Sequence, residues 1–362
     1  MQKIHVVGNH YSYFEFFHPV RLFRKALKER GLDVHYFFNI LAKGIEECDV
    51  LIFQEDNYRQ LLPIQNKDRQ STVDFLKDYF SRFPRVVWFD SNDSSGWLRS
   101  YVFPLVDVYA KSQVLKNRKY YQEDHVTGIL HRDYLIEKFG VKDNKIAKGP
   151  ISEKDSLKIR VAWRQAYRHK NRLNRLPFLG RVSRYLPPRM LSYQTTQPNL
   201  IQRDKVLQYH VRTWEDNPPI YWWREQTKKQ LLQVLKKHPD YKLITSGHVP
   251  LNKYLKELEN CPVTISPFGL NEFCLRDIWA FVSGSLLFKP SLDHVESFPD
   301  YYQDGDTYIS HAWDFSDFEE KLDDILSHPQ LYEDIAREGQ SRFIKVIQDG
   351  AGFARQFDRM VS

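Results

Sequence analysis

The segment VTISPFGLNEFCLRDIWAFVSGSLLFKPSLDHVESFPDYYQDGDTYISHAW, residues 263–313, decides the fold of this chain of 362 residues. Val263 to Ile265 predict a short buried strand, because β-branched side chains suit a pleated surface. Ser266-Pro267-Phe268-Gly269 ends that strand, since proline lacks a backbone N–H and glycine accepts unusual backbone angles. A helical pattern runs to Gly284, and the apolar run 285–288 predicts a second strand. These elements form one βαβ unit, whose ligand loop lies at the carboxyl end of its first strand.

Polar residues stand at the start of the predicted helix. Asn271 and Glu272 fall where free backbone N–H groups and the helix dipole attract anions. Glu272 and Arg276 are four residues apart, so a helix would place them on one face. A carboxylate accepts hydrogen bonds from sugar or ribose hydroxyls, and an arginine holds a diphosphate with paired donors. The alternative interpretation is an ordinary surface ion pair.

The segment resembles the donor-binding half of GT-B glycosyltransferases, above all bacterial cell-surface polysaccharide enzymes and exostosin-like proteins. Their signature is S-P-F-G-x-x-E-x-x-x-R-D-x-x-A-x-x-x-G. It is matched here by Ser266, Pro267, Phe268, Gly269, Glu272, Arg276, Asp277, Ala280 and Gly284. The segment is also similar to the family 4 retaining enzymes, which carry two glutamates eight positions apart. This chain has Asn271 and Trp279 at those positions, so the stereochemical outcome of a transfer stays open.

The resemblance implies an α/β protein of the GT-B class, with two Rossmann-like doubly wound domains facing a cleft and a C-terminal helix crossing back to the first domain. The expected acceptor-binding domain is 1–155 together with a helix at about 345–362. A basic helix and linker are expected at 156–200, and a nucleotide-sugar-binding domain at 201–344. The first half supports this expectation by itself, because strands predicted at 4–7, 34–38, 49–53, 85–89 and 106–110 alternate with helical segments.

The implied activity is a metal-independent glycosyl transfer from a nucleotide sugar to a glycan or lipid-linked acceptor in bacterial surface polysaccharide synthesis. No cofactor is expected besides the nucleotide sugar, which is a co-substrate. Two other classes remain open. One is a nucleic-acid-binding protein that uses basic residues 158–189, with Trp163, Tyr167 and Tyr185 as stacking groups. The other is a transferase-like scaffold without activity.

The amino-acid composition indicates which classes of protein are compatible with this chain. An apolar fraction of 42% with 15% aromatic residues indicates a globular protein, and no run of about 18 apolar residues predicts a membrane span. The N-terminal strand lacks the apolar core of a signal peptide. Cys48, Cys261 and Cys274 contain no C-x-x-C pair, which disfavours a disulfide framework or a zinc site. A cytoplasmic protein with reduced thiols is therefore expected.

Residues 156–190 contain no acidic residue and ten basic ones. Ile159, Ala162, Trp163 and Ala166 recur at helical spacing, which predicts a basic amphipathic helix. Such a helix would hold the protein at an anionic membrane surface or against a lipid-pyrophosphate acceptor. The alternative is that the basic face packs on acidic surface of the protein itself. The ten residues are Lys158, Arg160, Arg164, Arg168, Lys170, Arg172, Arg175, Arg181, Arg184 and Arg189.

Glycosyl transfer requires positive charge at the departing diphosphate and, for an inverting enzyme, a base at the acceptor hydroxyl. Asp90 and Asp93, after a predicted strand, are the first candidates for the base, with His10 and Glu15 as rivals; the alternative is that the aspartates are ordinary turn residues. Asp304-Gly305-Asp306 predicts a turn, and no metal site is expected there. The expected donor contacts are Arg212, Gly247, His248, Phe268, Gly269, Asn271, Glu272, Arg276, Lys289 and His294.

Overall fold

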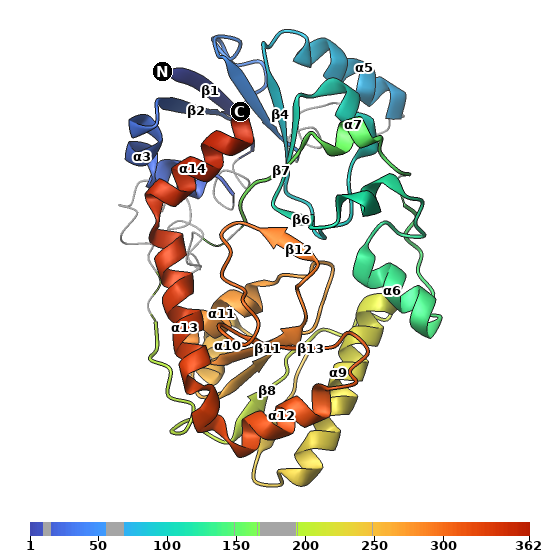
Figure 1. Cartoon of the computed structure of the whole chain (residues 1–362), viewed down its shortest axis with the longest axis vertical. Helices are drawn as coiled ribbons and strands as arrows, with labels where there is room; N and C mark the ends of the chain where they lie inside the picture. The colour runs from blue at the N-terminus through green and yellow to red at the C-terminus, as the bar shows by residue number, and fades with distance from the viewer. Residues whose placement is uncertain are drawn as a thin grey trace.

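The computed structural model describes residues 1–9, 16–55, 69–147, 149–164, 166, 193, 195–247 and 249–362. Within them, two parallel sheets lie at opposite ends of the molecule, with a small antiparallel pair between them (Figure 1). We call the part built on the six-stranded sheet the first domain and the part built on the five-stranded sheet the second domain.

The first sheet has the order β2-β1-β3-β4-β5-β7, and neighbouring strands pair in parallel. Strands β3, β4 and β5 are buried along their whole length, as expected of a sheet that helices cover on both faces. The strands are β1 (Gln2–Val7), β2 (Leu32–Phe37), β3 (Val50–Gln54), β4 (Val86–Asp90), β5 (Val108–Lys111) and β7 (Ile159–Val161). The helices around them are α2 (His18–Leu22), α3 (Arg24–Glu29), α5 (Arg69–Phe80), α6 (Leu130–Phe139) and α7 (Glu153–Ser156).

The second sheet has the order β13-β11-β10-β8-β9. Taken from β9, its five strands follow in chain order the same doubly wound arrangement as the first five strands of the first sheet. Its strands are β8 (Val206–Gln208), β9 (Lys242–Ile244), β10 (Val263–Ile265), β11 (Leu286–Pro290) and β13 (Ile309–His311). Its helices are α9 (Pro218–Lys237), α10 (Leu251–Leu258), α11 (Leu275–Ser283), α12 (Phe318–Ser327) and α13 (Pro329–Gln348).

The predicted βαβ unit is confirmed. Val263 of β10 pairs in parallel with Leu286 of β11, and α11 connects the two strands. Gly284 ends α11 with a left-handed backbone angle (φ 67°), which glycine adopts without strain. A Cβ atom there would lie 2.6 Å from the carbonyl oxygen of Thr196, so both conformation and space require glycine.

One local prediction is wrong. Residues 159–161 form strand β7 rather than a basic helix, because the edge of the first sheet takes the apolar Ile159 and Val161 as alternate buried positions. The helical segment after β1 is divided at Phe23 into α2 and α3. Asp317 is at the N-terminal cap position of helix α12.

Two elements join the domains. Strand β6 (Gln113–Leu115) of the first domain pairs antiparallel with β12 (Val295–Ser297) of the second. Helix α14 (Gly350–Val361) follows α13 and returns to the first domain, where it lies beside α3 (Figure 1). Arg30, at the C-terminal cap of α3, donates to Asp358 of α14, with Nε 3.2 Å from Oδ2. The predicted C-terminal crossing helix is therefore confirmed.

Within the part of the chain described above, no helix combines the length and the apolar character that a membrane span requires.

Candidate active site

A buried ion pair between Lys289 and Asp277 stabilises the loop 266–274, which connects β10 to α11. Nζ of Lys289 lies 2.6 Å from Asp277 and 2.7 Å from the backbone carbonyl of Glu272. Asp277 also accepts from Ser266 and Tyr302. Burial opposes ionisation of Asp277, but the charge of Lys289 and the hydrogen bonds from Lys289, Ser266 and the backbone N–H of Cys274 together outweigh burial and lower its pKa. The positive charge of Lys289 is thus used within the loop, and its contact with a donor stays a prediction.

Helix α11 begins later than the sequence pattern indicated. Asp277 accepts from the backbone N–H of Cys274, which caps the helix so that its first residue is Leu275. Glu272 therefore lies in the loop, and the prediction that Glu272 and Arg276 share a helical face is wrong.

Glu272 is fully buried at the junction of the domains. Ser95 of the first domain donates to its carboxylate from the backbone N–H, 3.1 Å from Oε2, and from the hydroxyl, 2.6 Å from Oε1. Nδ1 of His131 and Nε2 of His294 lie 3.6 and 3.9 Å from Oε1. Burial alone would raise the pKa of Glu272, but the two imidazoles outweigh burial and hold it well below its usual value. The geometry gives Glu272 a structural part in the junction; its predicted donor contact is untested.

Asn271 links the two walls of the site. Its side-chain oxygen accepts from Gln113 of β6, and its amide nitrogen lies 3.4 Å from Oδ1 of Asp93. Asp93 is open to an interdomain cavity of about 300 Å³. Partial burial raises the pKa of Asp93, although the hydrogen bond from Asn271 opposes that rise. A carboxylate with a raised pKa that faces a cavity is suited to proton transfer.

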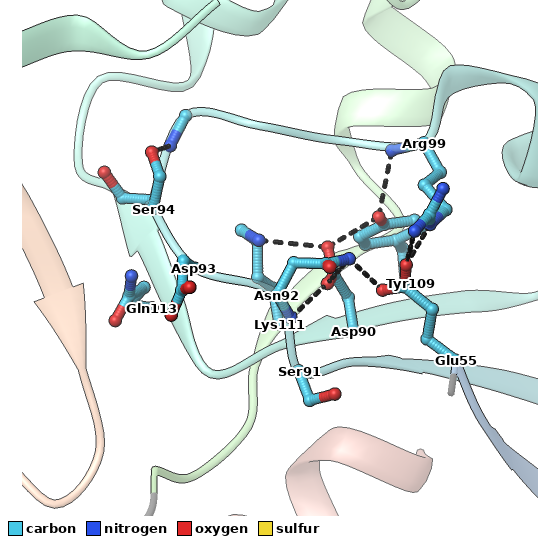
Figure 2. A network of polar contacts seen from close by, with 12 residues as sticks. Glu55, Asp90, Ser91, Asn92, Asp93, Ser94, Arg99, Tyr109, Lys111 and Gln113 are labelled. Carbon is cyan, nitrogen blue, oxygen red and sulfur yellow. Dashed lines mark hydrogen bonds and ion pairs between the residues drawn. The ribbon is translucent and has the colours of Figure 1, made fainter. Parts of the chain in front are cut away.

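Asp90 lies three residues earlier but does not reach the cavity. Figure 2 shows its carboxylate enclosed by the side chains of Lys111, Tyr109 and Asn92. Lys111 donates from 2.9 Å and Tyr109 from 2.7 Å, and both residues are completely buried. Burial opposes ionisation of Asp90, yet the charge of Lys111 and the hydrogen bonds that Asp90 accepts together outweigh burial and lower its pKa. Asp90 therefore positions the loop that carries Asp93, and nothing bound in the cavity could contact it.

The charges of three arginines of the second domain act on one another, and we call them the arginine group: Arg212, Arg224 and Arg276. Arg224 lines the cavity and donates to the backbone carbonyl of Arg212. Arg212 and Arg224 both lie over the ring of Trp214, at 5.7 and 5.5 Å from its centre. Burial lowers the pKa of Arg224, and the charges of Arg276 and Arg212 lower it further. Like charges held together in this way attract an anion.

The remaining predicted contacts have different positions. Gly269 lines the cavity, and a Cβ there would lie 3.9 Å from Nη2 of Arg224. Phe268 is a core residue that packs on Trp223 and Trp313. Gly247 lies in an exposed turn after β9, away from the cavity lining. His10 and His248, like Glu15, lie outside the described residues.

Sequence reasoning missed several residues of this site. Arg224 lies inside the long helix α9, where one arginine among lysines gives no signal. Arg164 was assigned to a basic helix, but it is buried against Phe273 in the cavity wall. Ser95 and Gln113 matter only through contacts to residues more than 150 positions away, which no local pattern reveals.

No family model and no curated protein matches the chain. Solved structures resemble it at low identity. HepE of Anabaena, in complex with UDP, is 9% identical with a TM-score of 0.43, over 99% of both chains. An alpha-glucosyltransferase in complex with UDP and DNA is 11% identical with a TM-score of 0.39, over the whole of both chains. The pneumococcal O-GlcNAc transferase GtfA, in complex with UDP and GlcNAc, is 11% identical with a TM-score of 0.44, over 93% of this chain and 58% of that one. The two doubly wound sheets and the returning helix α14 of this chain form the GT-B fold.

Proposed function

We propose that the protein is a glycosyltransferase that moves a sugar from a nucleotide-sugar donor to a glycan or lipid-linked acceptor. The observation that carries the proposal is the arginine group beside loop 266–274, at the carboxyl end of β10. In open α/β sheets, ligands bind at that end of the strands. Negative charge develops on the diphosphate as it departs, and fixed cations stabilise this charge best in a partly dehydrated cavity.

The opposite wall supplies a group for the acceptor. Asp93 belongs to the first domain and opens into the same cavity as Arg224. An acceptor hydroxyl between the two walls would give its proton to Asp93 while the diphosphate leaves toward the arginine group. This arrangement supports an inverting transfer with Asp93 as the base.

Metal independence is part of the proposal. The arginine group supplies the positive charge that a divalent cation would otherwise supply. Both carboxylate oxygens of Asp304 accept from Ser310, at 2.7 and 2.6 Å, so the Asp304-Gly305-Asp306 segment serves as a turn. The proposed role in bacterial surface polysaccharide synthesis is supported by the sequence resemblance, and the proposed cytoplasmic location by the cysteine pattern.

Attachment to an anionic membrane surface is a separate proposal, supported now by the basic residues between 168 and 189, which lie outside the described residues. Arg164 does not take part in it, because it is buried in the cavity wall. Flotation with anionic liposomes at low and high salt tests it, using a variant with Arg172, Arg175 and Arg181 changed to Gln. Binding that this variant retains, or wild-type protein that ignores the liposomes at low salt, contradicts the proposal.

One of the three stacking residues expected for a nucleic-acid-binding protein, Trp163, is not accessible to a base. Trp163 is completely buried, packs against Phe17 and Phe357, and donates from its indole nitrogen to the backbone carbonyl of Phe16. It cannot stack on a base without unfolding this core. Tyr167 and Tyr185 lie outside the described residues.

The direct test is incubation with a panel of nucleotide sugars and detection of released nucleoside diphosphate. UDP-sugars come first, because UDP is bound in the HepE and GtfA structures. Release that increases when glycan or lipid-linked acceptors are added supports the proposal. Absence of nucleotide binding across UDP-, GDP- and dTDP-sugars would favour the scaffold alternative.

A further inference from the structure

Arg164 enters the interdomain cavity as a buried cation with unused hydrogen-bond donors. The residue is 7% exposed and lines the cavity with Asp93 and Phe273. Among the described residues, its Nε and Nη2 have no hydrogen-bond partner, and no carboxylate forms an ion pair with it. Buried donors of a charged group are rarely left unpaired in folded proteins.

Aromatic rings provide most of the surroundings of Arg164. The guanidinium carbon lies 3.6 Å from the centre of the Phe273 ring, and 5.2 and 5.1 Å from those of Tyr301 and Tyr302. These rings stabilise the positive charge through their faces, and the Tyr302 side chain also hydrogen-bonds to the guanidinium, but Nε and Nη2 have no acceptor among the described residues. The guanidinium edge that carries Nε and Nη2 is therefore available for an anion. The two parallel N–H groups of such an edge suit a carboxylate or a phosphate.

The nearest carboxylate does not fill this position. Asp277 acts on the charge of Arg164, but its oxygens accept from Lys289, Ser266 and Tyr302. Exchange of these partners for Arg164 would leave Lys289 buried without its counter-ion.

Arg164 is also distinct from the arginine group. The cations that act on Arg224 are Arg276 and Arg212, whereas the groups that act on Arg164 are Tyr301, Tyr302 and Asp277. Arg164 follows β7 of the first domain, whereas Arg224 lies on α9 of the second, so the two cations reach the cavity from different domains. The cavity thus contains two places for negative charge, and Asp93 and Gln113 of the first domain line it as well.

We infer that Arg164 forms a second anion subsite, which binds a carboxylate or phosphate carried by a sugar in the cavity. This inference rests on the proposed function and narrows its substrates to acidic sugars. The acidic group belongs either to the transferred sugar of the donor or to the acceptor.

Two calorimetric titrations distinguish these sources. The donor arm compares UDP-glucuronate with UDP-glucose, which differ in one carboxylate. The acceptor arm compares glucuronate and glucose 6-phosphate with glucose, in the presence of UDP. We expect at least one acidic probe to bind tenfold or more tightly than its neutral counterpart, and the arm that shows the preference identifies the source. Equal affinities in both arms overturn the inference.

Arg164→Gln should abolish the acidic preference, so that the ratio of acidic to neutral affinity falls to about one. Arg160→Gln is the matched control, because Arg160 is exposed on strand β7, four residues before Arg164. Its guanidinium contacts the backbone carbonyls of residues 157 and 159. A preference that survives Arg164→Gln, or is lost in Arg160→Gln, contradicts the assignment. Thermal melting verifies that each variant folds. If Arg164→Gln does not fold, Arg164→Lys replaces it, and this variant should lower the affinity for the acidic probe more than the affinity for the neutral probe.

Failure of the inference can be separated from failure of the proposed function. Nucleoside diphosphate release without an acidic preference would remove the subsite and keep the transferase. Acidic preference without nucleotide binding or release would keep an anion site and remove the transferase.

Discussion

Glu272 of the second domain accepts hydrogen bonds from both the backbone N–H and the hydroxyl of Ser95 in the first domain. These contacts connect the loop before α11 directly to the loop that carries Asp93. This buried carboxylate therefore helps to fix the relative position of the two cavity walls, together with the β6–β12 pair and the contacts of Asn271.

Glu272→Gln should lower the free energy of unfolding by about 1–3 kcal/mol, because the amide loses acceptor capacity and the attraction of two imidazoles. Chemical denaturation measures the change. Since the folded state lowers the pKa of Glu272, its ionised form stabilises the protein above the unfolded value of about 4.3, and this stabilisation is lost as the pH falls further. The variant should lack that acid-dependent loss.

Glu296→Gln is the control for this prediction, because Glu296 is half exposed and forms a surface pair with Arg118. Its effect should be within about 0.5 kcal/mol. Equal stability of the Glu272 variant and the wild type would show that the junction does not depend on this carboxylate.

Asp93→Asn should reduce turnover by about 10²-fold or more with little change in stability, as loss of a general base does. In the wild type, the raised pKa of Asp93 should produce a fall in rate on the acid side at a pH above the ordinary carboxyl value of about 3.9. Steady-state rates across pH measure both effects. Asp90→Asn is the contrasting variant: it leaves Lys111 buried without a counter-ion and should cost about 3–5 kcal/mol of stability. Full activity of Asp93→Asn would exclude Asp93 as the base.

Arg276→Ala and Arg224→Ala should each reduce turnover by about 10²-fold or more, since each removes a fixed charge from the diphosphate position. Lys228→Ala is the matched control, because Lys228 is an exposed cation on the same helix as Arg224. Rates that fall equally in the control would indicate a general effect of net charge. Wild-type rates in both arginine variants would mean that the diphosphate binds elsewhere.

Activity should survive exhaustive treatment with EDTA, because the arginine group carries the positive charge that the reaction requires. The assay compares treated protein with and without added Mg²⁺ or Mn²⁺. Loss on chelation with recovery on adding metal would contradict a metal-independent mechanism.

The sequence predicts the fold where local patterns and burial agree. The run Val263 to Ile265, the stop at Gly284 and the apolar residues after it gave β10, α11 and β11 because each signal is local. The pattern around Arg164 misled for the same reason: apolar residues at 159, 162, 163 and 166 fit a helix, but pairing with β5 makes residues 159–161 a strand.

The site was less predictable, because its contacts join distant residues. Asp90 and Asp93 lie in one predicted loop, yet Lys111 binds Asp90 and leaves Asp93 facing the cavity. Only the packing of β4 against β5 determines which carboxylate remains accessible. In the same way, the position of Lys289 at the end of a strand favours a contact with a ligand, but its side chain forms an ion pair with Asp277 and stabilises the loop 266–274 instead.

The central claim is that a donor diphosphate binds between the arginine group and the start of α11. A crystal structure with the nucleoside diphosphate released in the panel assay tests this claim most directly. We predict phosphate oxygens within hydrogen-bond distance of Arg224 and Arg276, with the nucleoside on the second domain. A diphosphate bound outside the cavity, or within the cavity but beyond reach of both arginines, would contradict it.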